Sequence, residues 1–198
     1  MATINSNNLG VYAYDAAMTT PLEVLDTATA IGSLTNDDAP SGAAEGDKFL
    51  VVNGTAFVGI AEVSSAVGSA AVTDRTSSLS LVALATSSSL ESSVAVNETA
   101  ARNGSGGSTN FIASGAMSWS TSVDGLLDVA GATGSAITVM DAARSKNYMI
   151  VKFDIDEGAG NTFYAGQVLI DSVSISGGVD DIATYSASFT GYGDLYKG

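Results

Sequence analysis

The chain of 198 residues contains no cysteine and no histidine. The absence of cysteine excludes a disulfide and a thiolate nucleophile, and the absence of histidine excludes a Ser-His-Asp triad and an imidazole zinc site. Only carboxylate, lysine, tyrosine or Ser-Lys chemistry remains for an enzyme. Lys146 directly follows Ser145, which is not a spacing that a Ser-Lys dyad uses. We therefore expect neither catalysis nor a metal or cofactor.

Basic residues are scarce, because 7 lysines and arginines stand against 21 acidic residues and leave a formal charge of −14. Tight nucleic-acid binding depends on clustered lysine and arginine that neutralise phosphates, so DNA and RNA are not expected as tightly held ligands. Long apolar runs are also missing: no stretch approaches the roughly 20 residues that a membrane helix needs. The first ten residues lack the pattern of a secretion signal, and we expect no membrane partner.

Prolines number only two, whereas glycines number 22, and short β-branched runs alternate with Ser, Thr, Asn and Gly. This composition predicts many short strands joined by turns within a single domain, residues 1–198. The clearest unit is a hairpin in which Lys48–Val52 and Thr55–Val63 flank Asn53-Gly54. A polar, turn-rich loop at 36–42 precedes it.

The central region changes pattern twice. Residues 77–97 contain neither Gly nor Pro and predict one long strand or two strands meeting at a kink, followed by a surface loop at 103–108. A strand at 111–122 then places Met117 and Trp119 on one face and serines on the other. Apolar spacings of three and four between 134 and 146 predict the only substantial helix, packed against the outside of a sheet.

Three later segments alternate with a period of two, namely Tyr148–Asp156, Thr162–Ser176 and Ile182–Thr190. Such alternation predicts antiparallel strands with one face on a core. The other face consists of Ser, Thr and a few Asp, with almost no Lys or Arg. Sheets that merely face solvent usually carry more long charged side chains, so this small, polar face is expected to have a function.

Several of these segments resemble, in order, the major tail proteins that form the tail tube of long-tailed bacteriophages and gene transfer agents. The most specific are SWSTSVDGL at Ser118–Leu126, the Gly-x-x-x-Ile-x-Ser pattern at Gly166–Ser172, and the Ala183–Leu195 segment that follows it. The resemblance covers roughly residues 79–195. It implies a mainly β (α+β) fold of two packed antiparallel β-sheets with one flanking α-helix, extended loops and terminal arms.

The resemblance also implies a structural protein of the virion, assembled in the host cytoplasm, whose hexameric rings stack into a tube that conducts genomic DNA. Its implied partners are further copies of itself, a tape measure protein, a tail terminator and distal tail or baseplate proteins. Residues 36–78 depart from shorter members of the family, and we interpret them as an inserted hairpin or as an element that stacks on the next ring.

We expect individual side chains to have roles in the core, in contacts between subunits and in the wall of the channel. Trp119 is expected to anchor the core, since large aromatic residues mostly serve packing. Residues 191–198 are expected to form a C-terminal arm between subunits or rings, with contacts from Tyr192, Leu195 and Tyr196. Because a basic wall would trap DNA, acidic residues on the polar face are expected to line the channel. The candidates for this lumen are Glu91, Asp154, Asp156 and Asp171.

A different class of protein stays open at this point. A monomeric β-sandwich that binds carbohydrate, or an adhesin domain, would use a platform of surface aromatics such as Tyr12, Tyr14, Tyr164 and Tyr192. That alternative leaves the SWSTSVDGLLD element and the closing GYGDL unexplained. The acidic pairs at 37–38 and 180–181 sit in turn-like contexts, and we interpret them as solvated turns rather than as an acid–base pair.

Overall fold

A computed structural model describes residues 10–64, 71–82, 85–102, 108–127, 136–155, 162–177 and 182–198; at 97–102, 108–114 and 136 it describes the backbone alone. Strands predominate and one α-helix accompanies them, which confirms the mainly β prediction. The strands are β1 (Gly10–Met18), β2 (Glu23–Asp26), β3 (Lys48–Asn53), β4 (Ala56–Glu62), β5 (Thr73–Asp74), β6 (Ser80–Leu81), β7 (Ala85–Arg102), β8 (Ser108–Leu126), β9 (Tyr148–Asp154), β10 (Phe163–Ser176) and β11 (Thr184–Lys197). The helix is α1 (Ala136–Ser145), and short 3₁₀ turns lie at Ile31–Ser33, Asn36–Asp38 and Thr76–Ser78.

All of these strands belong to one hydrogen-bonded sheet that is not closed into a barrel. Its main run is antiparallel, in the order β7-β8-β11-β10-β9-β1-β6, and parallel pairing occurs between β2 and β3 and at a single point between β11 and β4. Two register shifts in β10, near Gly166 and Asp171, interrupt its pairing with β11. Bulges bend strands, so the sheet curls instead of splitting. The prediction of two separate antiparallel sheets is wrong in this respect.

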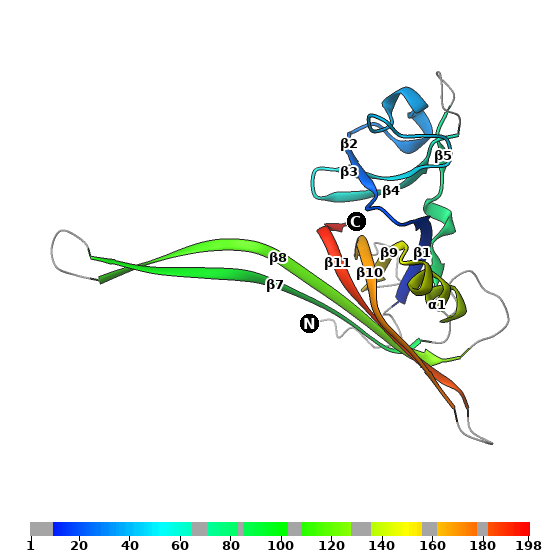
Figure 1. The fold of residues 1–198 in the computed structure, drawn as a ribbon. Helices are drawn as coiled ribbons and strands as arrows, with labels where there is room; N and C mark the ends of the chain where they lie inside the picture. The colour runs from blue at the N-terminus through cyan, green and yellow to red at the C-terminus, as the bar shows by residue number, and fades with distance from the viewer. Residues whose placement is uncertain are drawn as a thin grey trace.

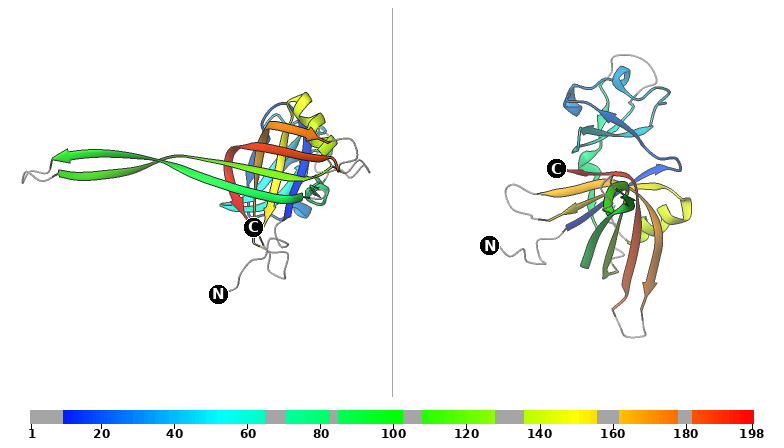
Figure 2. Two further views of the ribbon diagram at one scale, coloured as in Figure 1. Left: turned by 90° about the horizontal axis from the view of Figure 1, so that it is seen from below. Right: turned by 90° about the vertical axis from the view of Figure 1, so that its left-hand side faces the viewer.

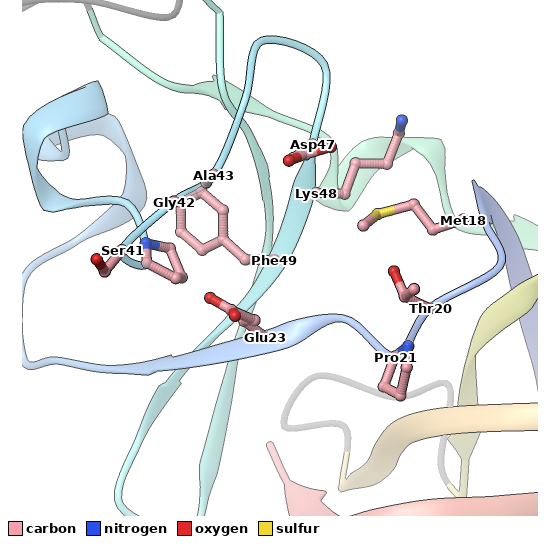
Figure 3. A pocket seen from close by; sticks show the side chains of 11 residues that line it. Met18, Thr20, Pro21, Glu23, Ser41, Gly42, Ala43, Asp47, Lys48 and Phe49 are labelled. Carbon is pink, nitrogen blue, oxygen red and sulfur yellow. The ribbon is translucent and has the colours of Figure 1, made fainter.

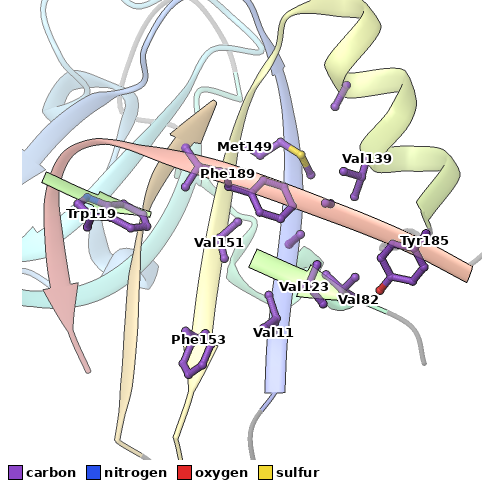
Figure 4. Packing of buried hydrophobic residues seen from close by; sticks show 14 residues of the cluster. Val11, Val82, Trp119, Val123, Val139, Met149, Val151, Phe153, Tyr185 and Phe189 are labelled. Carbon is purple, nitrogen blue, oxygen red and sulfur yellow. The ribbon is translucent and has the colours of Figure 1, made fainter. Parts of the chain in front are cut away.

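The main core lies inside this curl. Side chains from β1 and β9 meet side chains from β8 and β11, and helix α1 closes the open side (Figure 4). Val123 and Phe189 come from one half of the sheet, Val11 and Met149 come from the other, and all four are at most 1% exposed. Val139 of α1 is fully buried against them. The single sheet thus achieves the packing that two sheets would give.

Two local predictions are confirmed. The 3.6-residue period at 134–146 yields α1, and the helix ends at Ser145 because Lys146 has a left-handed backbone with φ of 56°. The hairpin at 48–63 is formed by β3 and β4. Its two-residue turn consists of Gly54 and Thr55, one position later than predicted, and Gly54 supplies the positive φ of 60° that the turn needs.

The hairpin belongs to a small unit, residues 20–78, that carries strands β2 to β5 and lies beyond one end of the main sheet (Figure 1). We call it the β2–β5 unit. It has its own core around Phe49, Val51 and Leu34. Gln167 of β10 ties it to the main sheet, because the buried amide accepts a hydrogen bond from Leu22 N (2.8 Å) and donates one to Leu22 O (2.6 Å).

An ion pair fastens the far side of this unit. Arg75 donates to Glu62 through Nε (2.8 Å) and Nη2 (3.3 Å), and Lys48 Nζ lies 3.7 Å from Oε2 of the same carboxylate. The hydrogen bonds from Arg75 hold the pKa of Glu62 below its usual value, while partial burial opposes the shift and Lys48 supports it.

This geometry gives a prediction for pH dependence. A carboxyl whose pKa is lower in the folded state stabilises the fold above its unfolded pKa, and the stabilisation is lost as pH falls through the folded pKa. Glu62→Gln is therefore expected to lower the free energy of unfolding by about 0.5–1 kcal/mol at pH 7. In thermal melts recorded from pH 7 to pH 3, the difference from the wild type should shrink as pH falls below the ordinary pKa of a glutamate, about 4.3. A constant difference at all pH values would contradict this origin.

The hairpin of β7 and β8 projects far from the body of the molecule (Figures 1 and 2). Pairing between β8 and β11 ends at Ser120, and from there residues 92–102 pair with 108–119 only, among the strands described. At about 3.3 Å per residue this two-stranded stretch is roughly 36 Å long. We call it the arm. The predicted strand at 77–97 is in fact β6 and β7, and the loop predicted at 103–108 lies almost wholly outside the described residues.

The prediction that residues 191–198 form a C-terminal arm is wrong. Strand β11 continues to Lys197 and pairs with β10 up to that point. Tyr196 is 9% exposed in a second core cluster with Leu22 and Phe57, and Leu195 packs against the main core. Tyr192 is 47% exposed and its ring meets that of Tyr148 edge-on at 5.4 Å. Sequence alone did not predict the core that the main sheet shares with the β2–β5 unit, in which Tyr196 is buried.

Candidate functional site

The outer face of strands β7, β8, β11 and β10 is made almost entirely of small hydroxyl side chains. Alternation places every second residue of each strand on this face, and the registers align these residues across the four strands. We call it the hydroxyl face: Ser87, Ser89, Glu91, Ser93, Ser118, Ser120, Ser122, Asp124, Asp171, Ser172, Ser174, Ser176, Thr184, Ser186, Ser188 and Thr190. All sixteen are exposed or half-exposed, and none is basic.

Neighbouring hydroxyls on this face bond to one another across the strands. Ser89 and Ser122 are 2.8 Å apart, Ser93 and Ser118 are 2.9 Å apart, and another such pair joins β10 to β11 at Ser172. Within the body of the molecule, the opposite side of these strands faces the main core, where Tyr185 of β11 is 3% exposed. Burial, reinforced by a nearby carboxylate, raises the pKa of Tyr185 to about 12. Within the body of the molecule, the face is therefore a polar layer over a neutral core.

Two of the four predicted lumen residues meet on this face. Glu91 of β7 and Asp171 of β10 line one shallow hollow of about 360 Å³, with Ser120 and Ser188 between them. Both carboxylates are exposed, and the hydroxyl of Ser188 lies 3.5 Å from Asp171 Oδ2. The hollow has carboxylate and hydroxyl oxygens at its wall and no cationic group, so it offers a phosphate no charge to pair with.

Asp154 does not share this face. Both faces of β9 are buried, since Phe153 packs in the main core and Ile150 in the second core cluster, and Asp154 is 2% exposed. Its Oδ2 pairs with Lys152 Nζ at 3.0 Å, while its Oδ1 has no partner among the described groups. The ammonium of Lys152 also lies 4.4 Å from the ring centre of Phe163. A carboxylate that is buried within its own chain cannot line a channel, so the prediction that Asp154 faces the lumen is wrong. Asp156 lies outside the described residues.

A second hollow, of about 330 Å³, lies between the start of β2 and the loop before β3 (Figure 3). Two of its ionisable groups already have partners, since Asp47 accepts a hydrogen bond from Ala44 N and Lys48 donates to Gly46 O. Nearby, a capping box between Thr35 and Asp38 closes the 3₁₀ turn at Asn36–Asp38. The hydrogen bond that Thr35 N donates to the Asp38 carboxylate lowers the pKa of Asp38. These groups organise loops, and they form no acid–base pair.

The tyrosines of the binding-module alternative do not form a platform. Tyr12 and Tyr14 are half-buried on β1 and Tyr164 is half-buried on β10. Of the four tyrosines only Tyr192 on β11 is exposed, at 47%. Tyr14 packs against the second core cluster, and the Lys152 ammonium lies 5.0 Å from the ring of Tyr12. Over the described part of the chain, we find no helix that is both long and apolar enough to cross a bilayer.

Sequence reasoning missed the apolar side of the arm. Val94 and Met117 lie directly opposite each other and point to the same side as Trp119, because their pair is two positions further along the ladder. Trp119 is 4% exposed in the core, whereas Val94 is 49% exposed and Met117 is 42% exposed. The face that is buried within the body therefore continues along the arm with nothing from the described chain to cover it.

The sequence matches the family model of the phage tail tube protein over residues 69–197. The chain belongs to the phage tail tube protein family. A tail tube protein is a structural component of the virion and not an enzyme. The hydroxyl face, the arm and the whole β7-β8-β11-β10 sheet lie within the matched range, whereas most of the β2–β5 unit precedes it.

A solved structure shows the same fold at low sequence identity. A chain in the virion of a native gene transfer agent particle is 14% identical, with a TM-score of 0.51, and the match covers 61% of this chain and 89% of that one. The SPP1 tail tube is 16% identical at a TM-score of 0.45, with coverage of 60% and 67%. No curated protein sequence matches the chain.

Proposed function

We propose that this tail tube protein forms hexameric rings, that the rings stack, and that the hydroxyl face lines the passage through which genomic DNA leaves the particle. The observation that carries the proposal is the hydroxyl face itself. DNA carries one charge per about 1.7 Å of its axis, so each exposed lysine in a channel wall would hold it. A wall of hydroxyls and carboxylates over neutral core residues leaves the duplex on water and counterions.

The strand edges support closure into a ring. The β10 pairing with β9 ends at Val168, so the rest of β10 has β11 on one side only among the described strands. At the other end of the hydroxyl face, β8 is the one described strand with which β7 pairs. Free edges are normally shielded by charge or proline, yet Glu91 is the only charged residue between 85 and 97.

Pairing the β7 edge of one copy with the β10 edge of the next would hide both edges. Six copies of this four-stranded sheet would close a barrel of about 24 strands, a size that leaves an open channel. The ring size of six comes from the family resemblance. A tape measure protein inside the tube, and terminator and distal tail proteins at its ends, complete the proposed set of partners.

The arm suits contact between copies. An isolated two-stranded ribbon is at best marginally stable in water, and Val94 and Met117 on the arm leave an apolar side exposed. We assign this side to a neighbouring copy in the tube. The β2–β5 unit, which lies away from the hydroxyl face (Figure 1), is proposed as an addition to the family domain that contacts the next ring or the outside.

Negative-stain electron microscopy of the purified protein at increasing concentration tests the proposed function. Rings or tubes with a central hole are the expected result. Sedimentation as a monomer of 19.8 kDa at every concentration, with no rings on the grids, would count against it.

A further inference from the structure

Trp119 lies at the point where two paired strands separate. Up to the pair of Ser120 with Thr190, β8 runs beside β11. Beyond it β8 continues into the arm, while β11 turns through Gly193, at a φ of +71°, and runs on to pair with Ala56 of β4. The arm and the β2–β5 unit thus diverge from a single place in the sheet.

The indole of Trp119 fills this divergence. Its Nε1–H donates a hydrogen bond to the carbonyl oxygen of Gly193 at 3.1 Å. A Cβ at Gly191 would overlap the ring atoms, and a Cβ at Gly166 would lie 2.6 Å from Cζ2. Since real Cβ atoms do not approach so closely, two strands carry glycine where the ring lies against them. Figure 4 shows the side chain at the edge of the core cluster, on the side away from α1.

A second contact fixes the other strand of the arm at the same level. Thr121 is 3% exposed, and its hydroxyl donates to the backbone oxygen of Ser89 on β7 at 2.7 Å. The base of the arm is therefore held on one side by a side chain that crosses to β7 and on the other by the indole that crosses to β11.

We propose that Trp119 is a positioning residue that sets the direction of the arm relative to the body. The indole bridges β8 to β11 at the last point where the two strands are close, so its packing and its hydrogen bond determine the angle at which β8 leaves the sheet. The consequence for assembly rests on the proposed function, because an arm pointing the wrong way misses the neighbouring copy. The positioning itself is a property of the monomer.

A distance measurement in the monomer tests the proposal. The chain has no cysteine, so a Val96→Cys and Val58→Cys pair places one spin label on the arm and one on β4, at side chains that are 58% and 37% exposed. Pulsed electron paramagnetic resonance at a concentration below assembly is expected to give a narrow distance distribution. A broad distribution in this parent would already overturn the proposal, because the arm would then be unheld.

Two variants of the labelled parent carry the decisive comparison. Trp119→Phe removes the donor and half of the ring, and Gly191→Ala displaces the ring while keeping it; each is expected to broaden or shift the distribution. Val139→Ala, which opens the same core at α1, serves as the control: it should lower the thermal midpoint and leave the distribution narrow. An unchanged distribution in whichever of the two Trp119-site variants folds would show that the residue is a packing residue only. Tube formation by the unlabelled wild type is scored separately. A failure of the proposed function can therefore be told apart from a failure of the positioning role of Trp119.

Discussion

Tubes that carry lysine at both Glu91 and Asp171 are expected to retain duplex DNA that wild-type tubes release. The two carboxylates line one hollow of the hydroxyl face, so the double variant turns an anionic hollow into a cationic one in every subunit. Both side chains are exposed, and within the described parts of the chain neither forms an ion pair or packs in the core. We therefore expect the variant to fold and to assemble.

The expected size follows from counterion release. A duplex that contacts six or more lysines binds the wall more tightly at low salt. Its affinity for the wall then falls by about 10³-fold or more between 50 and 200 mM salt. Tubes assembled with a short fluorescent duplex, pelleted and washed at graded salt, should hold roughly 100-fold more DNA than the wild type at low salt. The difference should shrink steeply as salt rises.

A matched control separates the wall from overall charge. Glu23→Lys with Glu45→Lys makes the same change of charge in the β2–β5 unit, at two exposed carboxylates away from the hydroxyl face. This control should retain no more DNA than the wild type. Equal retention by the two double variants would remove Glu91 and Asp171 from the wall of the passage.

Local patterns gave the most reliable sequence predictions. The helix at 136–145, the hairpin at 48–62 and the alternation of β11 all depend on neighbours within a few residues. The alternation also predicted the polar side of the sheet, and it placed Glu91 and Asp171 there before their strands were known to be close. What sequence could not supply was the order of the strands, which brings those two residues into one hollow.

The failures concern residues whose environment is set by distant parts of the chain. Asp154 alternates with apolar residues as a surface residue would, yet side chains on both faces of β9 are buried. Tyr196 follows what looks like the last strand, but the β2–β5 unit provides a second core for it. Asp154 pairs with Gly10 of β1, and Tyr196 packs with Leu22 and Phe57, so part of each environment comes from segments more than 130 residues away in the sequence, which no local pattern records.

The arm was missed for a related reason. The sequence pattern of its strands is typical of strands that pack on a core, because Val94 and Met117 are apolar like core residues. Only the structure shows that the body ends near Trp119 and that the same apolar side continues beyond it. The signal available in the sequence was length: 77–97 and 111–122 together exceed what a body of this size covers.

Val94→Asp combined with Met117→Asp is expected to abolish tube formation while leaving the monomer folded. The two side chains are directly opposite on the apolar side of the arm and largely exposed in the monomer, so surface substitutions there should change its stability by about 0.5 kcal/mol or less. Burying each against a neighbouring copy stabilises the contact by roughly 1–2 kcal/mol. An unpaired carboxylate in the same place costs several kcal/mol more.

The measurement is the protein concentration above which tubes appear in sedimentation and electron microscopy, and it should rise by more than about 100-fold, since each 1.4 kcal/mol is a factor of ten. The adjacent pair provides the control. Ser93→Asp with Ser118→Asp adds the same charge one position away, on the hydroxyl face, where a carboxylate is compatible with an open passage. Because the two double variants differ only in the side of the arm that they alter, loss of tubes in both would point to repulsion between arms. Loss in the Val94 and Met117 variant alone would identify the apolar side as the contact with the neighbouring copy.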